Sequence, residues 1–122
     1  MTLLILESDR QFAEVIGVIL RSEDDEFVVA ATPEKANRFL DERQVDAVVL
    51  NARVDRRSGI RWLESLAIRQ PHLARRALVY FRGEPHELDM RRVERLGAGK
   101  LLEPASPREW IEAFLRQTVD SE

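Results

Sequence analysis

The sequence Asp46-Ala47-Val48-Val49-Leu50-Asn51-Ala52-Arg53-Val54-Asp55-Arg56-Arg57-Ser58-Gly59 carries the strongest structural signal in this chain. An apolar run rich in β-branched residues ends at Asn51 and a charged loop, and the Ser58-Gly59 pair then opens a helical pattern. This pattern predicts a buried parallel strand that brings Asn51 to its carboxyl end. Because open α/β sheets bind their ligands at that edge, Asn51 is the first candidate site residue.

Short apolar runs of the same kind recur along the chain. They predict strands at residues 2–6, 27–31, 45–50, 77–81 and 100–102. A helical pattern follows each run, and the clearest helix starts are Thr32-Pro33 and the capping box from Ser106 to Glu109. The alternation predicts an α/β fold, a (βα)5 doubly wound five-stranded parallel sheet with helices on both faces, because crossovers between parallel strands are right-handed.

Length and composition narrow the class of protein. The chain has 122 residues, which predicts one domain over residues 1–118, with residues 119–122 as a tail or the start of a linker. The absence of cysteine excludes disulfides, a thiolate nucleophile and a Cys-based zinc site. No run approaches the roughly 18 apolar residues of a membrane span, and no signal-peptide pattern is present, so we expect a cytoplasmic protein without membrane contact. A net charge of −3 gives no broad positive field, so nucleic acid is not expected as a partner of this domain alone.

Four motifs accompany the strand pattern. An acidic group follows the first strand, Gly59 lies eight residues after Asn51, a Gly-Ala pair follows the fourth helical pattern, and Pro104 opens the last loop. With these motifs the chain resembles the receiver domain of bacterial two-component response regulators over essentially its whole length. The resemblance implies a flavodoxin-like fold with strand order 2-1-3-4-5.

The resemblance also implies a phosphorylation site. Receiver domains are phosphorylated on an aspartate at the tip of strand three, and an acidic pair after strand one holds Mg2+. A Thr or Ser after strand four and a Lys after strand five contact the phosphoryl group. A carboxylate can form an acyl phosphate, clustered acids bind a hard cation, and lysine and hydroxyl groups orient phosphoryl oxygens.

This chain departs from the family pattern at each of these positions. Asn51 replaces the acceptor, and an amide is not a competent nucleophile for acyl phosphate formation. The remaining positions of this degenerate phosphoacceptor pocket are Glu7 and Ser8 for the acidic pair, with Asp9 beside them, Phe81 and Arg82 after strand four, and Glu103 for the lysine. We therefore predict a pseudo-receiver that is not an enzyme, has no cofactor and binds Mg2+ poorly. It would signal, independently of phosphorylation, through a protein partner or an effector domain.

Other interpretations of the same residues stay open. Asn51 is expected to hydrogen-bond to Glu7 or Ser8, to bridge to Glu103 and Arg82, or only to satisfy the loop. A charge pair between Arg82 and Glu103 is a further hypothesis. Two alternative functions are a phosphorelay receiver that uses Asp55 or Asp9 as its acceptor, and a small-ligand sensor at the strand tips, which lacks a glycine-rich phosphate loop. Weak metal binding through Glu7, Asn51 and the Arg53 carbonyl is a minor alternative.

Two surface features suggest partners. The family resemblance implies an output and dimer face on helix four, strand five and helix five, so a homodimer is one expectation. The matching residues are Arg91, Arg95, Lys100, Arg108 and Trp110, although Trp110 fits equally a place beside Phe114 in the core. Arginines also cluster around residues 53–61 and 91–95, either as a solvated face neutralised by neighbouring acids or as a site for an anion or an acidic partner. His72 and His86 are expected at the surface.

Overall fold

The computed structural model describes residues 1–119 and contains a central parallel sheet of five strands. The order across the sheet is β2-β1-β3-β6-β7. The strands are β1 (Thr2–Leu6), β2 (Glu26–Ala30), β3 (Ala47–Asn51), β6 (Ala77–Arg82) and β7 (Gly99–Glu103). Since β6 and β7 are the fourth and fifth strands of the sequence prediction, both the parallel sheet and the order 2-1-3-4-5 are confirmed.

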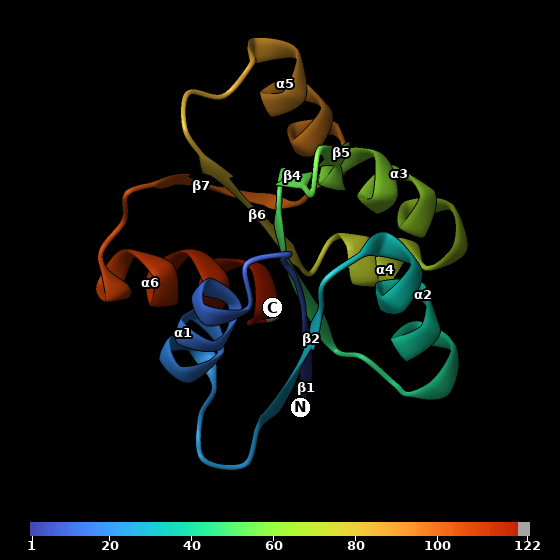
Figure 1. Cartoon of the computed structure of the whole chain (residues 1–122), viewed down its shortest axis with the longest axis vertical. Coiled ribbons are helices and arrows are strands. Elements are labelled where there is room, and N and C mark those ends of the chain that lie inside the picture. Colours follow the sequence, from blue (N-terminus) through green and yellow to red (C-terminus); the bar gives the residue numbers. More distant parts are fainter. Residues whose placement is uncertain (120–122) are drawn as a thin grey trace.

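Helices cover both faces of this sheet (Figure 1). The helices α1 (Arg10–Leu20) and α6 (Pro107–Thr118) lie on one face. The opposite face carries α2 (Pro33–Glu42), α3 (Gly59–Arg69), α4 (Pro71–Ala74) and α5 (Glu87–Arg95). The described part of the chain thus has six helices, whereas the sequence pattern predicted five. Pro71 ends α3 because it cannot donate a backbone hydrogen bond, and it starts the extra helical turn of α4 at the first helical position.

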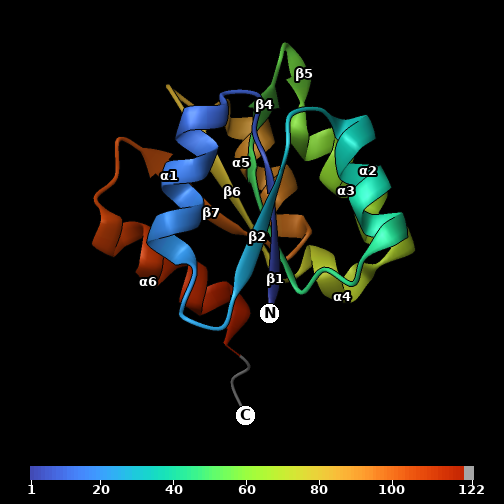
Figure 2. The same ribbon diagram turned by 60° about the horizontal axis from the view of Figure 1, so that its bottom comes forward.

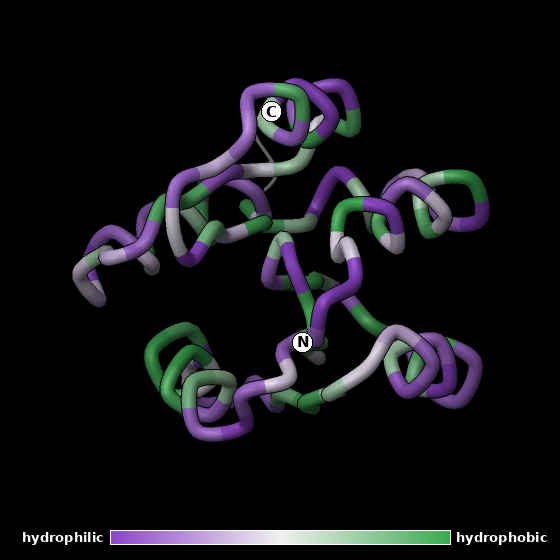
Figure 3. Tube along the Cα trace, turned by 45° about the horizontal axis from the view of Figure 1, so that its top comes forward, coloured by the Kyte–Doolittle hydropathy of each residue, from purple (hydrophilic) through white to green (hydrophobic). Residues whose placement is uncertain are grey.

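The alternation of side chains along the strands produces two apolar cores. Leu4, Leu50 and Val79 point to the side of α2, α3 and α5, while Ile5 and Val49 point to the side of α1 and α6. All of these side chains are fully buried, as a doubly covered parallel sheet requires. In Figure 3 hydrophobic and hydrophilic stretches alternate along the helices, as expected for helices that bury one face against the sheet.

Local signals set most of the helix starts. Asp9, Thr32 and Ser58 each accept a backbone N–H from the first turn of the following helix, and the capping box between Ser106 and Glu109 is formed. The helix starts predicted at Thr32, Ser58 and Ser106 are confirmed. No helix within residues 1–119 is long and apolar enough to cross a membrane. The predicted tail begins at Val119, and its remaining positions 120–122 lie outside the described residues.

A hairpin follows β3 where the sequence predicted only a charged loop. The strands β4 (Arg53–Val54) and β5 (Arg57–Ser58) pair antiparallel and extend past the carboxyl edge of the sheet (Figure 2). The turn residues Asp55 and Arg56 both have positive φ angles, 47° and 68°. Such two-residue turns are normally encoded by Asn-Gly or Asp-Gly, and this chain has arginine at the second position, so the usual sequence signal is missing.

Gly59 joins this hairpin to α3 at very close range. A Cβ atom at this position would lie 2.1 Å from the carbonyl oxygen of Asn51. Only glycine lets the start of α3 approach the end of β3 so closely. The spacing of eight residues between Asn51 and Gly59, noted in the sequence, therefore has a steric cause.

Candidate functional site

The carboxyl ends of three neighbouring strands bring Glu7, Asn51 and Tyr80 together. Glu7 directly follows β1 and is 2% exposed, while Asn51 ends β3 and is 8% exposed. The register of β3 and β6 places Tyr80 beside Asn51. Asn51 Nδ2 donates to Oε1 of Glu7 at 3.0 Å, and the Tyr80 hydroxyl donates to the same oxygen at 2.5 Å. The predicted contact between Asn51 and Glu7 is confirmed.

Two backbone groups complete this buried network. Oε2 of Glu7 accepts the backbone N–H of Asp9 at 3.1 Å, and Oδ1 of Asn51 accepts the backbone N–H of Arg53 at 3.0 Å. Within the described residues Glu7 thus receives three hydrogen bonds from uncharged donors and forms no ion pair. These donors compensate the carboxylate for the water it loses on burial.

Tyr80 is the site residue that the sequence analysis missed. Burial raises the pKa of its hydroxyl far above the ordinary range, and the negative charge of Glu7 raises this pKa further. The hydroxyl therefore remains a neutral donor. A signal was present in the sequence, because Tyr80 is the chain's one tyrosine and lies in an otherwise apolar strand, where a buried hydroxyl needs a partner.

An aromatic cluster covers the inner side of the network. The ring centroids of Phe12 and Trp110 lie 5.6 Å and 5.0 Å from that of Tyr80. Trp110 is only 3% exposed and belongs to the same core cluster as Phe114, so its predicted place in the core is confirmed and its place on an exposed partner face is wrong. Its indole packs instead against Tyr80 and Phe12 beneath α6, because burying this large ring stabilises the core more than exposure to water would.

At the outer rim of the site, one predicted contact is replaced by others. Arg82 stacks over the ring of Phe12 at 4.0 Å and lies 3.4 Å from Oδ2 of Asp9. The predicted pair between Arg82 and Glu103 is therefore not formed, although the two residues are neighbours in the β6–β7 register. The aromatic face and the Asp9 carboxylate together offer the guanidinium a better position. Oε2 of Glu103 is buried without a hydrogen-bond partner in the described residues.

The other two pocket positions offer little chemistry. Phe81 is buried in the core on the side of α2 and α3, and it presents no hydrogen-bonding group. Ser8 is exposed beside Asp9. Within residues 1–119 no group of three or more His, Asp or Glu side chains is placed to hold a metal ion. The structure thus brings together Glu7, Asn51 and Asp9, with Arg82 at the rim, and leaves Phe81 and Ser8 outside the network.

Four of the five predicted partner-face residues lie on or near the surface of α5, β7 and α6. Arg91, Lys100 and Arg108 form ion pairs with Glu87, Glu94 and Glu112, at 2.7, 2.8 and 3.0 Å respectively. Arg95 is exposed. Leu88 and Leu102 on the same elements are 60% and 48% exposed, and the sequence analysis did not select them.

The predicted surface histidines are confirmed. His86 caps α5 and is exposed, with its Nδ1 accepting the backbone N–H of Leu88 at 3.1 Å. His72, in the short α4, is also exposed.

Comparison with solved structures identifies the architecture. A receiver domain protein (CheY-like) from Methanospirillum hungatei matches with a TM-score of 0.83 and 18% identity, over 96% of this chain and 92% of the other. The N-terminal receiver domain of a response regulator from Bacteroides fragilis matches with a TM-score of 0.83 and 16% identity, over 98% of both chains. The chain has the receiver-domain fold. NtrX from Brucella abortus matches this receiver fold with a TM-score of 0.81 and 19% identity, over 96% of this chain but 26% of that one.

Sequence comparison adds no family assignment to the fold. No protein-family model and no curated protein matches this chain. At 16–19% identity the structural matches establish the receiver fold alone.

Proposed function

We propose that this receiver-fold domain is a pseudo-receiver, a non-enzymatic signalling module that acts by binding a partner protein or an effector domain and does not depend on phosphorylation. The observation that carries the proposal is the hydrogen bond from the Asn51 amide to Glu7 inside a closed buried network. We place the domain in the cytoplasm, in two-component signal transduction.

The position at the tip of β3 supports the loss of phosphotransfer. An acyl phosphate requires a carboxylate oxygen as nucleophile, whereas the side chain of Asn51 is an amide that is already engaged at both ends. Its nitrogen donates to Glu7 and its oxygen accepts from the backbone of Arg53. Neither atom points freely toward an incoming phosphoryl group.

The side chains at this site do not provide the coordination that Mg2+ requires. This cation needs near-octahedral oxygen coordination that includes one or two carboxylates. Both oxygens of Glu7 are occupied by hydrogen-bond donors, and Asn51 directs its nitrogen rather than its oxygen toward Glu7. Asp9 caps α1 and lies beside Arg82, so it is engaged elsewhere. A metal would have to displace several of these contacts at once.

The two positions that contact phosphoryl oxygens in the family pattern also carry different side chains in this chain. Phe81 offers no hydroxyl, and Glu103 presents a negative charge after β7 where the resemblance implies a lysine. A phosphoryl group near Glu103 would be repelled rather than neutralised. The chain thus lacks the nucleophile, one metal ligand, the hydroxyl and the lysine of the family pattern, and each of these losses favours a domain that is not phosphorylated.

Incubation with acetyl phosphate or beryllofluoride in the presence of Mg2+ tests this proposal. We expect no change in intact mass and no shifts of the backbone amide NMR signals around residues 7–9 and 51–53. A receiver domain that retains its acceptor aspartate serves as the positive control in the same buffer. A stable adduct on this domain would refute the proposal.

The alternative acceptors have little support from the geometry. Asp55 occupies the exposed tip of the β4–β5 hairpin, and Asp9 uses its carboxylate to cap α1 and to contact Arg82. Phosphopeptide mapping after treatment with acetyl phosphate distinguishes them. Recovery of a phosphorylated peptide that contains either residue would favour the phosphorelay function over the pseudo-receiver.

A further inference from the structure

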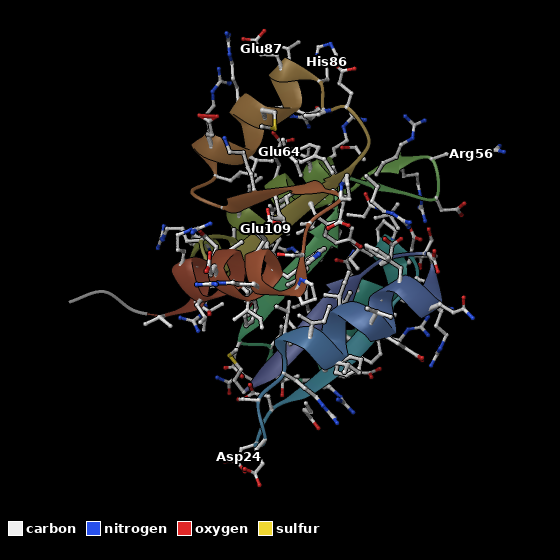
Figure 4. All side chains as sticks on the ribbon, turned by 90° about the vertical axis from the view of Figure 1, so that its left-hand side faces the viewer. Asp24, Arg56, Glu64, His86, Glu87 and Glu109 are labelled. Atoms are coloured by element: carbon white, nitrogen blue, oxygen red, sulfur yellow. The ribbon has the colours of Figure 1, made fainter. Side chains whose placement is uncertain are left out.

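The β4–β5 hairpin carries three arginines beyond the sheet. Arg57 is held by α2, since its two terminal nitrogens donate to the carboxylate of Glu34 at 2.7 and 2.9 Å. Arg53 and Arg56 are exposed, and their guanidinium groups have no ion pair or hydrogen bond within the described residues. Figure 4 shows the side chain of Arg56 extending from the tip of the hairpin into solvent.

The hairpin tip has an unfavourable backbone conformation for its sequence. Asp55 and Arg56 both occupy the left-handed region, with φ angles of 47° and 68°. Aspartate tolerates this region better than arginine does, and glycine would adopt it without steric cost. An arginine at this position therefore lowers stability, and such outliers tend to occur at binding and functional sites.

Three contacts hold the hairpin in this shape without any ligand. Val54 is fully buried in the core, and the backbone N–H of Gly59 donates to the carbonyl of Ala52 at 2.8 Å. The fork between Arg57 and Glu34 fixes the second strand. Arg53 and Arg56 are thus presented from a preorganised support, which lowers the entropy cost of binding.

Two adjacent hollows lie beside the hairpin, and both are lined by Ala52, Arg53 and Asp89. One has a volume of about 210 Å³ and also touches Arg56, and the other, of about 240 Å³, reaches His86 in the loop before α5. Each is smaller than the roughly 300–1,000 Å³ of typical small-molecule pockets. Because the two hollows share three lining residues, they are adjacent, and a segment that reaches into both fits them better than one compact ligand.

The unpaired charges along this groove are mainly positive. Asp89 forms an ion pair with Arg92 at 3.3 Å. Asp55 lies close to Arg57: the hydrogen bonds to Glu34 are the main cause that raises the pKa of the Arg57 guanidinium, and the charge of Asp55 also raises it. Glu84 is the exposed acid on the bank opposite Arg53 and Arg56. Nucleic acid fits poorly, since the chain has a net charge of −3 and only two free arginines would contact phosphates.

We infer that the groove between the β4–β5 hairpin and the β6–α5 loop binds an extended acidic segment of a partner protein, with Arg53 and Arg56 as its carboxylate-binding residues. The inference rests on the proposed function in one respect: a domain without a phosphorylation switch requires a permanently formed binding surface. Paired arginine–carboxylate contacts would give both affinity and register.

A titration of the isotope-labelled domain with a blocked oligoglutamate peptide at low ionic strength tests this inference. We expect amide NMR shifts confined to residues 52–58 and 83–89, and loss of the shifts at high salt. The double variant Arg53→Ala/Arg56→Ala should bind at least about tenfold more weakly, as expected for two lost charge-assisted contacts. The matched control Arg38→Ala/Arg116→Ala removes the same charge from exposed positions on α2 and α6, and this variant should bind as the unchanged domain does.

Several outcomes would overturn the inference. They are absence of binding, shifts that map to other elements, equal weakening by both double variants, or stronger binding of a single-stranded oligonucleotide than of the peptide. An oligoglutamine peptide should not bind. The acetyl phosphate experiment is scored separately by mass, so a phosphorylated domain that still binds the peptide would refute only the proposed function.

Discussion

The hydroxyl of Tyr80 donates to Oε1 of Glu7, the same oxygen that accepts the amide of Asn51. One carboxylate oxygen thus joins the ends of β1, β3 and β6 at the edge where parallel α/β sheets place their sites. The donors are a phenol and an amide rather than a metal ion or a lysine. The network is complete without any ligand, so it stabilises one arrangement of the strand ends.

The alkaline titration of Tyr80 should follow unfolding rather than ordinary phenol ionisation. The folded pKa of this hydroxyl is raised by burial and by Glu7, whereas in the unfolded chain it has the ordinary value of about 10. The resulting stability is fully present below about pH 10 and is lost as pH rises from there toward the folded pKa.

The single tyrosine makes this prediction simple to measure. We expect the phenolate absorbance to appear together with the loss of circular dichroism, well above pH 10, while the domain in concentrated urea titrates near pH 10. Phenolate formation near pH 10 in a domain that is still folded would contradict the buried hydrogen bond.

Removal of the Tyr80 hydroxyl should destabilise the domain through Glu7. Tyr80→Phe keeps the ring packed against Trp110 but withdraws one of three donors from a buried carboxylate. We expect the free energy of unfolding in urea to fall by about 1.5–3 kcal/mol, the usual cost for a hydrogen bond to a charged group. A Glu7→Gln background removes the charge, so Tyr80→Phe should cost less there, with a coupling energy of about 0.5–3 kcal/mol. Full additivity of the two substitutions would show that they do not interact.

Replacement of Asn51 by aspartate should weaken the fold and should not restore phosphorylation. The substitution exchanges a donor at 3.0 Å from Glu7 for a second carboxylate, and like charges at this distance raise the pKa of the added group. The loss of folding stability is small near pH 4, where the added carboxyl group retains its proton, and this loss grows as the pH rises toward 8.

Urea unfolding at both ends of this pH range measures the effect. Asn51→Asp should lose about 1–3 kcal/mol more stability at pH 8 than at pH 4, whereas the control Asn51→Ala withdraws one donor from Glu7 without adding a charge and should show a smaller pH dependence. Acetyl phosphate should leave the mass of Asn51→Asp unchanged, because Phe81 and Glu103 remain in place. Efficient phosphorylation of this variant would mean that the pocket has kept more function than we propose.

Local sequence signals account for most of the fold and only part of the site. The sheet and the helix caps follow from strand periodicity and from short motifs such as Ser106-Pro107, which act within a few residues. The contact between Asn51 and Glu7 was predictable because both follow neighbouring strands of a parallel sheet. The partner of Arg82 was not, because it depends on the rotamer of a long side chain that has Phe12, Asp9 and Glu103 within reach. Sequence also does not show which face of β6 carries Tyr80 until the register is known.

The hairpin tip provides a prediction in which stability and binding change in opposite directions. Arg56 has a φ angle of 68°, a conformation that costs a non-glycine residue roughly 1 kcal/mol and costs glycine almost nothing. Arg56→Gly creates the Asp-Gly sequence preferred in two-residue hairpin turns, so the free energy of unfolding should rise by about 0.5–1 kcal/mol and the melting temperature by a few degrees. The same exchange within α6, Arg116→Gly, should instead destabilise by about 1 kcal/mol, because glycine is a poor helix former.

Thermal unfolding of both variants measures this contrast, and the oligoglutamate titration should show weaker binding by Arg56→Gly despite its higher stability. If Arg56→Gly were less stable than the unchanged domain, the side chain of Arg56 would be contributing to folding, and its proposed role in binding an acidic partner would lose its main structural support.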